Sequence, residues 1–236
     1  MITNGSGFSA KAAALKCAGL DRVTFSLDSL DRENFRAITG VDRLDDVVAA
    51  IHSAKDAGFA NTKVNAVIIR GRNDHEIVGL ARFARREGLS MRFIEFMPLD
   101  SGRTWDRRHV VSGAEIRDRI DAVFPLVLAR PSRGKETAWR YRFADGEDGE
   151  IGIIASVTDA FCGACSRVRL TADGQLRTCL FSAREYDLRQ VLRNGGDDAD
   201  LAELIRFAVR NKEPGHSINS GGFAYAASRT MSAIGG

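Results

Sequence analysis

The chain has 236 residues, of which 44% are hydrophobic and 28% are charged, and its net charge is +3. So small a charge does not indicate a nucleic-acid-binding protein, and four cysteines are too few for a disulfide framework. No apolar run reaches the roughly 18 residues of a membrane-spanning helix, and the N-terminus lacks the basic-then-apolar order of a signal peptide. We therefore expect a cytoplasmic protein with neither a nucleic-acid nor a membrane partner.

Short apolar runs alternate with amphipathic stretches over residues 1–122. The runs are residues 1–4, 22–27, 62–69 and 91–97, and helices are expected at 9–18, 44–57, 74–87 and 114–123. Strands that alternate with helices indicate a parallel sheet with right-handed crossovers. Glycines 19, 58 and 88 follow three of these helices, where a left-handed residue is favoured.

Polar residues follow three of the expected strands, in the segments 3–5, 26–29 and 95–98. The carboxyl edge of a parallel sheet or barrel usually carries the active site, so we expect these segments to contribute to it. A structural alternative exists for each segment: Ser29 and Asp31 can be helix caps, and Met97 can be core filler.

The pattern changes near residue 123, where we place a domain boundary between residues 1–122 and 123–236. Strands are expected at 126–128, 138–143 and 151–157, followed by a hairpin over 168–180 and helices at 186–192 and 201–210. The fold class predicted for the second part is α+β.

Three of the four cysteines, Cys162, Cys165 and Cys179, lie close together in the sequence. Two residues, one of them Gly163, separate the first two cysteines and should form a turn between them. The third cysteine comes from the far end of the hairpin. Three thiolates suit an iron–sulfur cluster with one open iron, which the spacing favours, or a zinc site that borrows a fourth ligand. The alternative is three buried, inert thiols, and Cys17 is expected to be a core residue.

Several segments together resemble one family, the radical S-adenosylmethionine enzyme GTP 3′,8-cyclase, also called molybdenum cofactor biosynthesis protein A. They read ITNG, AGLDRVTFSLDSLDRENFRAITG, KVNAVIIRGRNDHE, RFIEFMPLD, EIGIIASVTDAFCGACSRVRLTADGQLRTCLF and MSAIGG. The resemblance runs from residue 2 to residue 236 and covers the later two-thirds of the family's length. It implies an incomplete (βα) TIM-type barrel, with its later strands only, and a C-terminal domain that binds GTP and a [4Fe–4S] cluster.

The resemblance also implies the reaction. GTP is converted to (8S)-3′,8-cyclo-7,8-dihydroguanosine 5′-triphosphate by 5′-deoxyadenosyl radical chemistry, in molybdenum cofactor (molybdopterin) biosynthesis. The enzyme is a lyase whose implied partners are GTP, S-adenosylmethionine and an electron donor, and a homodimer is compatible with it.

The family's site residues can be transferred onto matching positions of this chain. The resemblance implies cluster ligands at Cys162, Cys165 and Cys179, with an open iron that binds guanine. It further implies GTP contacts at Lys63, Arg92, Arg167 and Arg169, S-adenosylmethionine contacts at Ser26 and Met97, and a terminal Gly235-Gly236 that enters the active site. Arg167 and Arg169 are two apart on the expected strand, so their guanidinium groups should share a face.

The family's first cluster motif, C-x3-C-x2-C, does not occur within the 236 residues, and Ile2 stands where the family usually has threonine. Because Met1 directly precedes ITNG, we expect a late start or a truncation. This chain would then carry one cluster and the full-length enzyme two. The alternatives are a truncated, non-catalytic remnant that binds GTP and an iron–sulfur cluster and, less favoured, a structural zinc domain.

Overall fold

The structure, a computed structural model, describes residues 1–99, 104–216, 218 and 229–234. The chain divides into two compact units. The first unit contains Met1–Phe96 and Arg107–Asp159, and the second contains Met97–Asp106 and Ala160–Gly236. Among the described residues, no helix is both long and apolar enough to cross a membrane.

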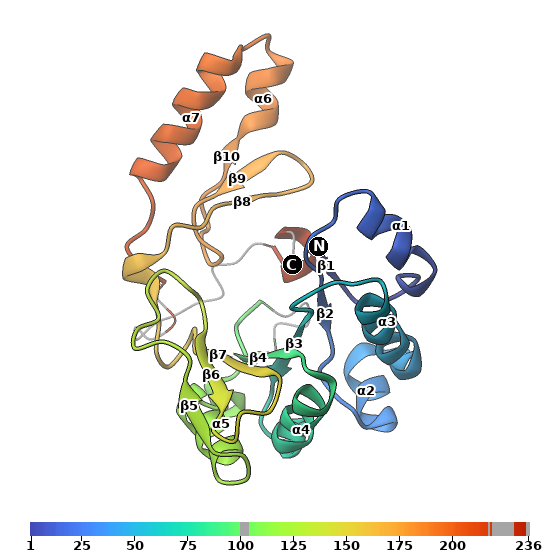
Figure 1. Ribbon diagram of the computed structural model, residues 1–236. Helices are drawn as coiled ribbons and strands as arrows, with labels where there is room; N and C mark the ends of the chain where they lie inside the picture. Colours follow the sequence, from blue (N-terminus) through green and yellow to red (C-terminus); the bar gives the residue numbers. More distant parts are fainter. Residues whose placement is uncertain (100–103, 217, 219–228, 235–236) are drawn as a thin grey trace. The chain divides into compact units, whose positions relative to one another are not determined.

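A seven-stranded sheet organises the first unit (Figure 1). Its strands, in spatial order, are β1 (Ile2–Thr3), β2 (Thr24–Ser26), β3 (Lys63–Ile68), β4 (Ser90–Glu95), β7 (Glu150–Ile154), β6 (Trp139–Phe143) and β5 (Leu126–Leu128). Strands β1, β2, β3, β4 and β7 pair in parallel with their neighbours in this order. Strand β6 then pairs antiparallel with β7, and β5 pairs antiparallel with β6. The parallel sheet expected from the first four apolar runs is confirmed.

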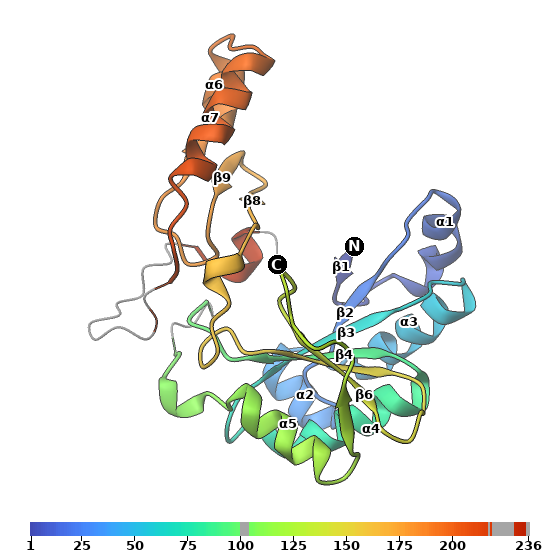
Figure 2. The ribbon, with the colours of Figure 1, turned by 60° about the vertical axis from the view of Figure 1, so that its left-hand side comes forward.

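Helices lie along one side of this sheet, as Figures 1 and 2 show. They are α1 (Ala12–Cys17), α2 (Arg32–Thr39), α3 (Leu44–Asp56), α4 (Ile77–Glu87) and α5 (Gly113–Asp121). Helix α2 was not predicted, because Phe35 is its one buried residue and no apolar periodicity results. Its cap was anticipated: Asp31 accepts a hydrogen bond from Asn34 N at 2.8 Å.

The expected helix ends are also borne out. Gly19, Gly58 and Gly88 all have positive φ, and Gly88 directly follows α4 as its left-handed cap. The expectation that Cys17 is a core residue is wrong, because this last residue of α1 is exposed.

The two faces of the sheet differ in chemistry because side chains alternate along each strand. On β3, β4 and β7 the residues of one parity are apolar and almost fully buried, and they form the core with the helices: Val64, Ala66, Ile68, Met91, Phe93, Ile151 and Ile153. The opposite parity is largely polar and carries Lys63, Asn65, Ser90, Arg92 and Glu150. We call this second surface the polar face.

The compact units divide the chain after Asp159, whereas the sequence placed a boundary near residue 123. Strand β7 pairs in parallel with β4, with Met91 opposite Ile151, and β6 then pairs with β7. These hydrogen bonds join residues 126–154 to the sheet of the first unit.

The second unit contains a three-stranded antiparallel sheet in the order β10 (Tyr186–Asp187), β9 (Gln175–Arg177), β8 (Arg169–Leu170), followed by α6 (Leu188–Arg193) and α7 (Asp198–Arg210). The predicted hairpin is confirmed, with Leu170 opposite Leu176. The helix expected from residue 186 begins at Leu188 instead, because Tyr186 pairs with Leu176 as a strand and Asp187 caps α6.

Candidate functional site

Lys63 and Arg92 both lie on the polar face of the first unit. Lys63 opens β3 and Arg92 is the third residue of β4, so both lie toward the amino ends of these strands rather than at the carboxyl edge. In the sheet register Asn65 is opposite Arg92, and Lys63 is opposite Ser90. Alternation along neighbouring parallel strands therefore brings two of the predicted GTP contacts to one surface.

A glycine on the neighbouring strand gives the Arg92 side chain its space. Gly152 of β7 is opposite Arg92 in the register, and a Cβ added to Gly152 would lie 2.4 Å from Arg92 Cδ. The guanidinium donates to Glu150 Oε1 at 3.3 Å, yet its buried Nε has no hydrogen-bond partner among the described residues. A buried donor without a partner is costly, so this side chain has capacity for a further acceptor.

The electrostatics of the polar face favour an anion. Partial burial lowers the pKa of Lys63, and the positive charges of Arg92, Arg22 and Arg140 lower this pKa further. Burial also lowers the pKa of Arg92, with Glu150 opposing this effect. The described chain gives the Lys63 ammonium no ion-pair partner.

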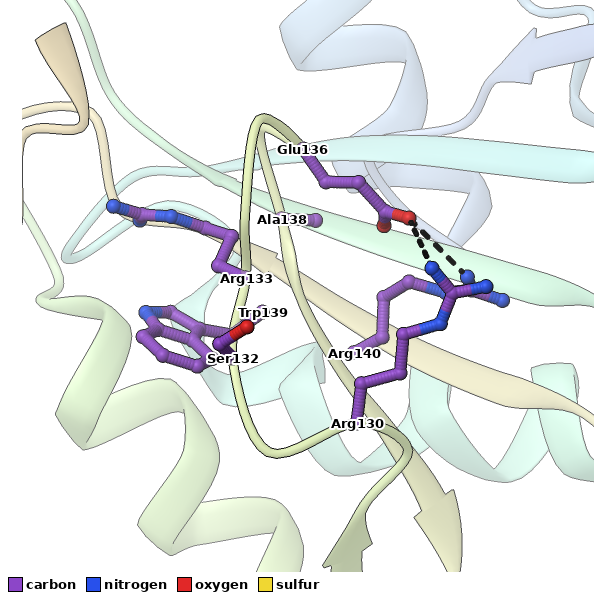
Figure 3. A pocket seen from close by; sticks show the side chains of 7 residues that line it. All are labelled: Arg130, Ser132, Arg133, Glu136, Ala138, Trp139 and Arg140. Carbon is purple, nitrogen blue, oxygen red and sulfur yellow. Dashed lines mark hydrogen bonds and ion pairs between the residues drawn. The ribbon is translucent and has the colours of Figure 1, made fainter. Parts of the chain in front are cut away.

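A second group of arginines, in the loop between β5 and β6 and at the start of β6, is already paired (Figure 3). Glu136 lies 3.4 Å from Arg130 and 3.6 Å from Arg140, and Arg133 lies 3.4 Å from Asp159. The pocket that these side chains line measures only about 10 Å³. This loop is therefore a poor candidate for binding a triphosphate.

Ser26 lies at the carboxyl end of β2 and lines a pocket of about 170 Å³. The same pocket is lined by Asn4, which follows β1, and by Asp28. Arg43, just before α3, and Asp46, in α3, line it as well. Burial raises the pKa of Asp28 to about 6, although its carboxylate accepts a 2.7 Å hydrogen bond from Val67 N. Two strand ends thus contribute polar groups to one pocket, as expected for the carboxyl edge.

Met97 and Leu99 begin the second unit. Leu99 N donates to Met97 O at 2.8 Å, and Met231 N donates to Leu99 O at 3.3 Å. The backbone of this segment therefore contacts the described C-terminal residues. Ser26 belongs to the first unit and Met97 to the second.

The three cysteines flank the hairpin of the second unit as free thiols. Cys162 opens a 3₁₀ turn (Cys162–Ala164), and Cys165 N donates to Cys162 O at 3.0 Å. Gly163 in this turn has no positive φ, so the turn does not depend on the backbone freedom of glycine. Cys179 comes shortly after β9, at the far end of the hairpin.

The thiols differ in their surroundings. Burial would raise the pKa of Cys165, but hydrogen bonds from Arg167, including Nε to Sγ at 3.3 Å, lower it overall. Burial raises the pKa of Cys179, and the nearby Glu213 and Cys162 raise this pKa further. A lowered pKa favours the thiolate that binds metal.

The donor set fits a thiolate-bound metal by its chemistry, with three free cysteines on neighbouring segments. Their geometry is not that of a finished site, however. Among the described residues, no three Cys, His, Asp or Glu side chains converge closely enough to hold a metal ion.

Arg167 and Arg169 have different environments. Arg169 lies in β8, is half-buried and donates to Ile234 O at 3.4 Å. Arg167 precedes the strand, is exposed and lies over the ring of Phe161, with its guanidinium carbon 4.9 Å from the centroid. The expectation that both arginines lie on a strand is therefore wrong for Arg167, because β8 begins at Arg169. Gly235 and Gly236 fall outside the described residues.

Sequence reasoning missed four supporting residues. Gly152 and Glu150 lie beside Arg92, Lys212 donates to Arg167 O at 3.0 Å, and Glu213 accepts from Thr178 Oγ1, next to Cys179, at 2.6 Å. In β7, Glu150 and Gly152 alternate with the apolar residues Ile151 and Ile153. This alternation is the sequence signal that could have placed Glu150 and Gly152 on the polar face. Lys212 and Glu213 follow α7 in a short polar segment with no pattern of its own.

Comparisons with known proteins identify the class to which the chain belongs. Residues 1–84 match the Radical SAM superfamily, and residues 89–218 match the family described as Molybdenum Cofactor Synthesis C. The two matches define the class as radical S-adenosylmethionine proteins of molybdenum cofactor synthesis.

Individual relatives narrow the class. The chain is 47% identical over 236 residues to a GTP 3′,8-cyclase of Mycobacterium sp. (strain KMS), covering all of this chain and 67% of the relative. It is 45% identical over 240 residues to that of Corynebacterium glutamicum (strain R), covering 63% of the relative. It is 46% identical over 242 residues to GTP 3′,8-cyclase 2 of Mycobacterium tuberculosis (strain CDC 1551 / Oshkosh), covering 66% of the relative. In all three comparisons the whole of this chain is aligned.

The chain belongs to the GTP 3′,8-cyclase family. It spans about two thirds of the length of these relatives.

Proposed function

We propose that this chain forms the GTP-binding part of a GTP 3′,8-cyclase, which converts GTP to (8S)-3′,8-cyclo-7,8-dihydroguanosine 5′-triphosphate. The observation that supports this most directly is the shortage of negative charge on the polar face. Lys63 and Arg92 share that face, Lys63 has a lowered pKa, and Arg92 keeps a buried Nε without a partner among the described residues. A triphosphate supplies the acceptors and the charge that such a surface needs.

The second unit would contribute the remaining GTP contacts, Arg167 and Arg169, and the cluster ligands Cys162, Cys165 and Cys179. These three cysteines would hold a [4Fe–4S] cluster that lacks a fourth protein ligand and could therefore bind the guanine base. Arg167 already donates to Cys165 Sγ, and this bond holds the guanidinium beside the thiols. The arginines bind and orient the triphosphate, and the half-buried position of Arg169 strengthens its charge-assisted hydrogen bonds.

S-adenosylmethionine would bind at the carboxyl edge of the first unit. The pocket beside Ser26 offers a hydroxyl and carboxylates to the amino-acid moiety, and Met97 would offer its backbone to adenine. When bound to a second cluster and given an electron from a donor, S-adenosylmethionine supplies the radical chemistry. Gly235 and Gly236 would complete the active site.

The proposal also assigns the two units to the parts of the family's fold. The parallel strands β1, β2, β3 and β4 would be the later strands of a (βα) TIM-type barrel. The hairpin, α6 and α7 of the second unit would form the GTP- and cluster-binding domain.

Calorimetric titration of GTP and guanosine tests the phosphate contacts. Replacing Arg167 or Arg169 with alanine should weaken GTP binding by roughly ten- to a hundredfold, because each charge-assisted contact contributes about 1.5–3 kcal/mol. Guanosine has no phosphates, so its weak binding should be almost unaffected. Unchanged GTP affinity in both variants would refute this role, and lysine at either position should rescue binding only partly.

The alternative is a non-catalytic remnant that binds GTP and a cluster. It is distinguished by incubating the protein with dithionite, S-adenosylmethionine and GTP under anaerobic conditions. Formation of 5′-deoxyadenosine rules out the remnant, whereas GTP binding without any such product supports it.

A further inference from the structure

The short segment from Lys212 to Gly215, which follows α7, contacts the backbone or side chains around all three clustered cysteines. We call it the 212–215 segment. Its contacts all lie within the second unit, and none of its residues was among the predicted site residues.

Lys212 connects the segments that carry Cys165 and Cys179. Its Nζ donates to Arg167 O at 3.0 Å and also to Thr178 O. Arg167 is two residues after Cys165, and Thr178 directly precedes Cys179. One ammonium group therefore links the backbone segments that carry Cys165 and Cys179.

Glu213 holds the surroundings of Cys179. Its carboxylate accepts hydrogen bonds from Thr178 Oγ1 at 2.6 Å and from Ser182 Oγ at 2.5 Å. Both hydroxyl-bearing residues are buried, with 1% and 4% of their surfaces exposed. Because buried hydroxyl groups need partners, the carboxylate helps to hold the backbone on both sides of Cys179, together with Arg184 O, which lies 3.0 Å from Ser182 Oγ.

Gly215 lies against Cys162. A Cβ added to Gly215 would be 3.2 Å from Cys162 Cβ and 3.7 Å from its Sγ. This is closer than side chains normally approach, so any larger residue here would push on Cys162.

We propose that the 212–215 segment is a brace that holds the segments of Cys165 and Cys179 together beside Cys162, so that the three thiols can be brought to one metal centre. Lys212 and Glu213 are positioning residues in this site, and Gly215 leaves space for Cys162. The inference rests on the proposed role of these cysteines as cluster ligands.

The brace acts on the backbone. The contacts of Lys212 are with two backbone carbonyl groups, and the three thiols themselves do not converge as metal ligands in the part of the chain that the structure describes. Holding the backbone in place beforehand reduces the ordering that metal binding must impose, and so raises metal affinity.

Cadmium binding to the reduced, metal-free protein tests the brace without any need for enzyme activity. Under anaerobic conditions, Cd²⁺ is titrated into the full chain, and the thiolate-to-cadmium charge-transfer band in the ultraviolet reports binding. Lys212→Met should weaken Cd²⁺ binding by about 10–100-fold, as is typical when a partner outside the ligand set is lost. Lys212→Arg should restore most of the affinity, because arginine can still donate to both carbonyl groups.

Lys135→Met is the matched control, because Lys135 is an exposed lysine of the first unit. It should bind Cd²⁺ like the wild type. Glu213→Gln keeps the side-chain shape but weakens acceptance from the two hydroxyl groups, so it should release iron from the reconstituted protein to a chelator faster than the wild type does.

The possible outcomes distinguish a failure of the brace from a failure of the proposed cluster site. If folded Lys212→Met binds Cd²⁺ as tightly as the wild type, the brace is wrong while the cluster site stands. If the wild type shows no thiolate–cadmium band, the cluster assignment fails, and the brace fails with it. If circular dichroism shows that Lys212→Met does not fold, Glu213→Gln decides, and unchanged iron release in that variant overturns the proposal.

Discussion

Arg92 and Gly152 occupy partner positions in the register of β4 and β7, and the guanidinium lies where a side chain on Gly152 would be. We expect Gly152→Ala to displace Arg92, because the added methyl group would lie 2.4 Å from its Cδ. Loss of one charge-assisted phosphate contact of about 1.5–3 kcal/mol should weaken GTP binding at least tenfold in a calorimetric titration.

Gly79→Ala is the control for this substitution. Gly79 lies in α4 with open space around its Cα, so alanine there should stabilise the helix by about 0.5–1 kcal/mol and leave GTP binding unchanged. If Gly152→Ala binds GTP as the wild type does, Arg92 either has room to move or does not contact the phosphates.

Asp28 gives a second prediction at the scale of one residue, since burial raises its pKa from 3.8 to about 6. Between these values the folded protein holds a proton that the unfolded chain has released, so this group lowers stability as pH rises from about 4 to 7. The change amounts to at most about 3 kcal/mol. Asp28→Asn cannot ionise but keeps an oxygen that can accept from Val67 N.

Urea unfolding of the variant and the wild type at several pH values measures this effect. Other carboxylates titrate in the same range, so the informative quantity is the difference in unfolding free energy between the two proteins. That difference should shift in favour of Asp28→Asn as pH rises from 4 to 7. A difference that is constant with pH would show that Asp28 titrates normally.

At the scale of elements, Glu95 joins three parts of the first unit. This fully buried residue ends β4, and its carboxylate accepts from Gly113 N at 2.7 Å, Val157 N at 2.7 Å and Thr158 N at 2.9 Å. It therefore ties the start of α5 and the residues after β7 to the end of β4. Glu95 begins the segment 95–98, and we interpret it as structural support for the carboxyl edge of the sheet.

Replacing Glu95 with alanine should lower the unfolding free energy by at least about 3 kcal/mol, because three backbone donors lose their acceptor. Glu95→Gln keeps one acceptor oxygen and should lose less. Urea unfolding followed by circular dichroism measures both variants. Equal stability of the alanine variant and the wild type would mean that water replaces the carboxylate.

Element boundaries show where local sequence patterns carry information. The strands and helices with a clear period, such as α3 and β3, were predicted within a few residues, because alternating burial imposes that period. Helix α2, with one buried residue, and strand β10, with two residues, leave no periodic signal. Their formation depends on caps and on pairing with distant strands.

For the whole molecule, the cysteine inventory predicts one cluster per chain. Anaerobic reconstitution should load about four iron atoms, as a single [4Fe–4S] cluster requires. Cys165→Ala should abolish iron retention, because it removes one of three ligands, whereas the exposed Cys17 should be replaceable by alanine without loss. Iron near eight atoms per chain, or equal iron in the two variants, would contradict this ligand assignment.

The amino-acid sequence by itself determined the family, the alternation of strands and helices, and the chemistry of the cysteine and arginine segment. Motif spacing and side-chain period are local properties, so they can be read along the chain. Only the tertiary structure decided that Lys63 and Arg92 share the polar face, that Gly152 gives Arg92 its space, and that Lys212 ties Arg167 to Thr178. These relations join residues tens of positions apart, and strand register and packing alone determine which of them meet.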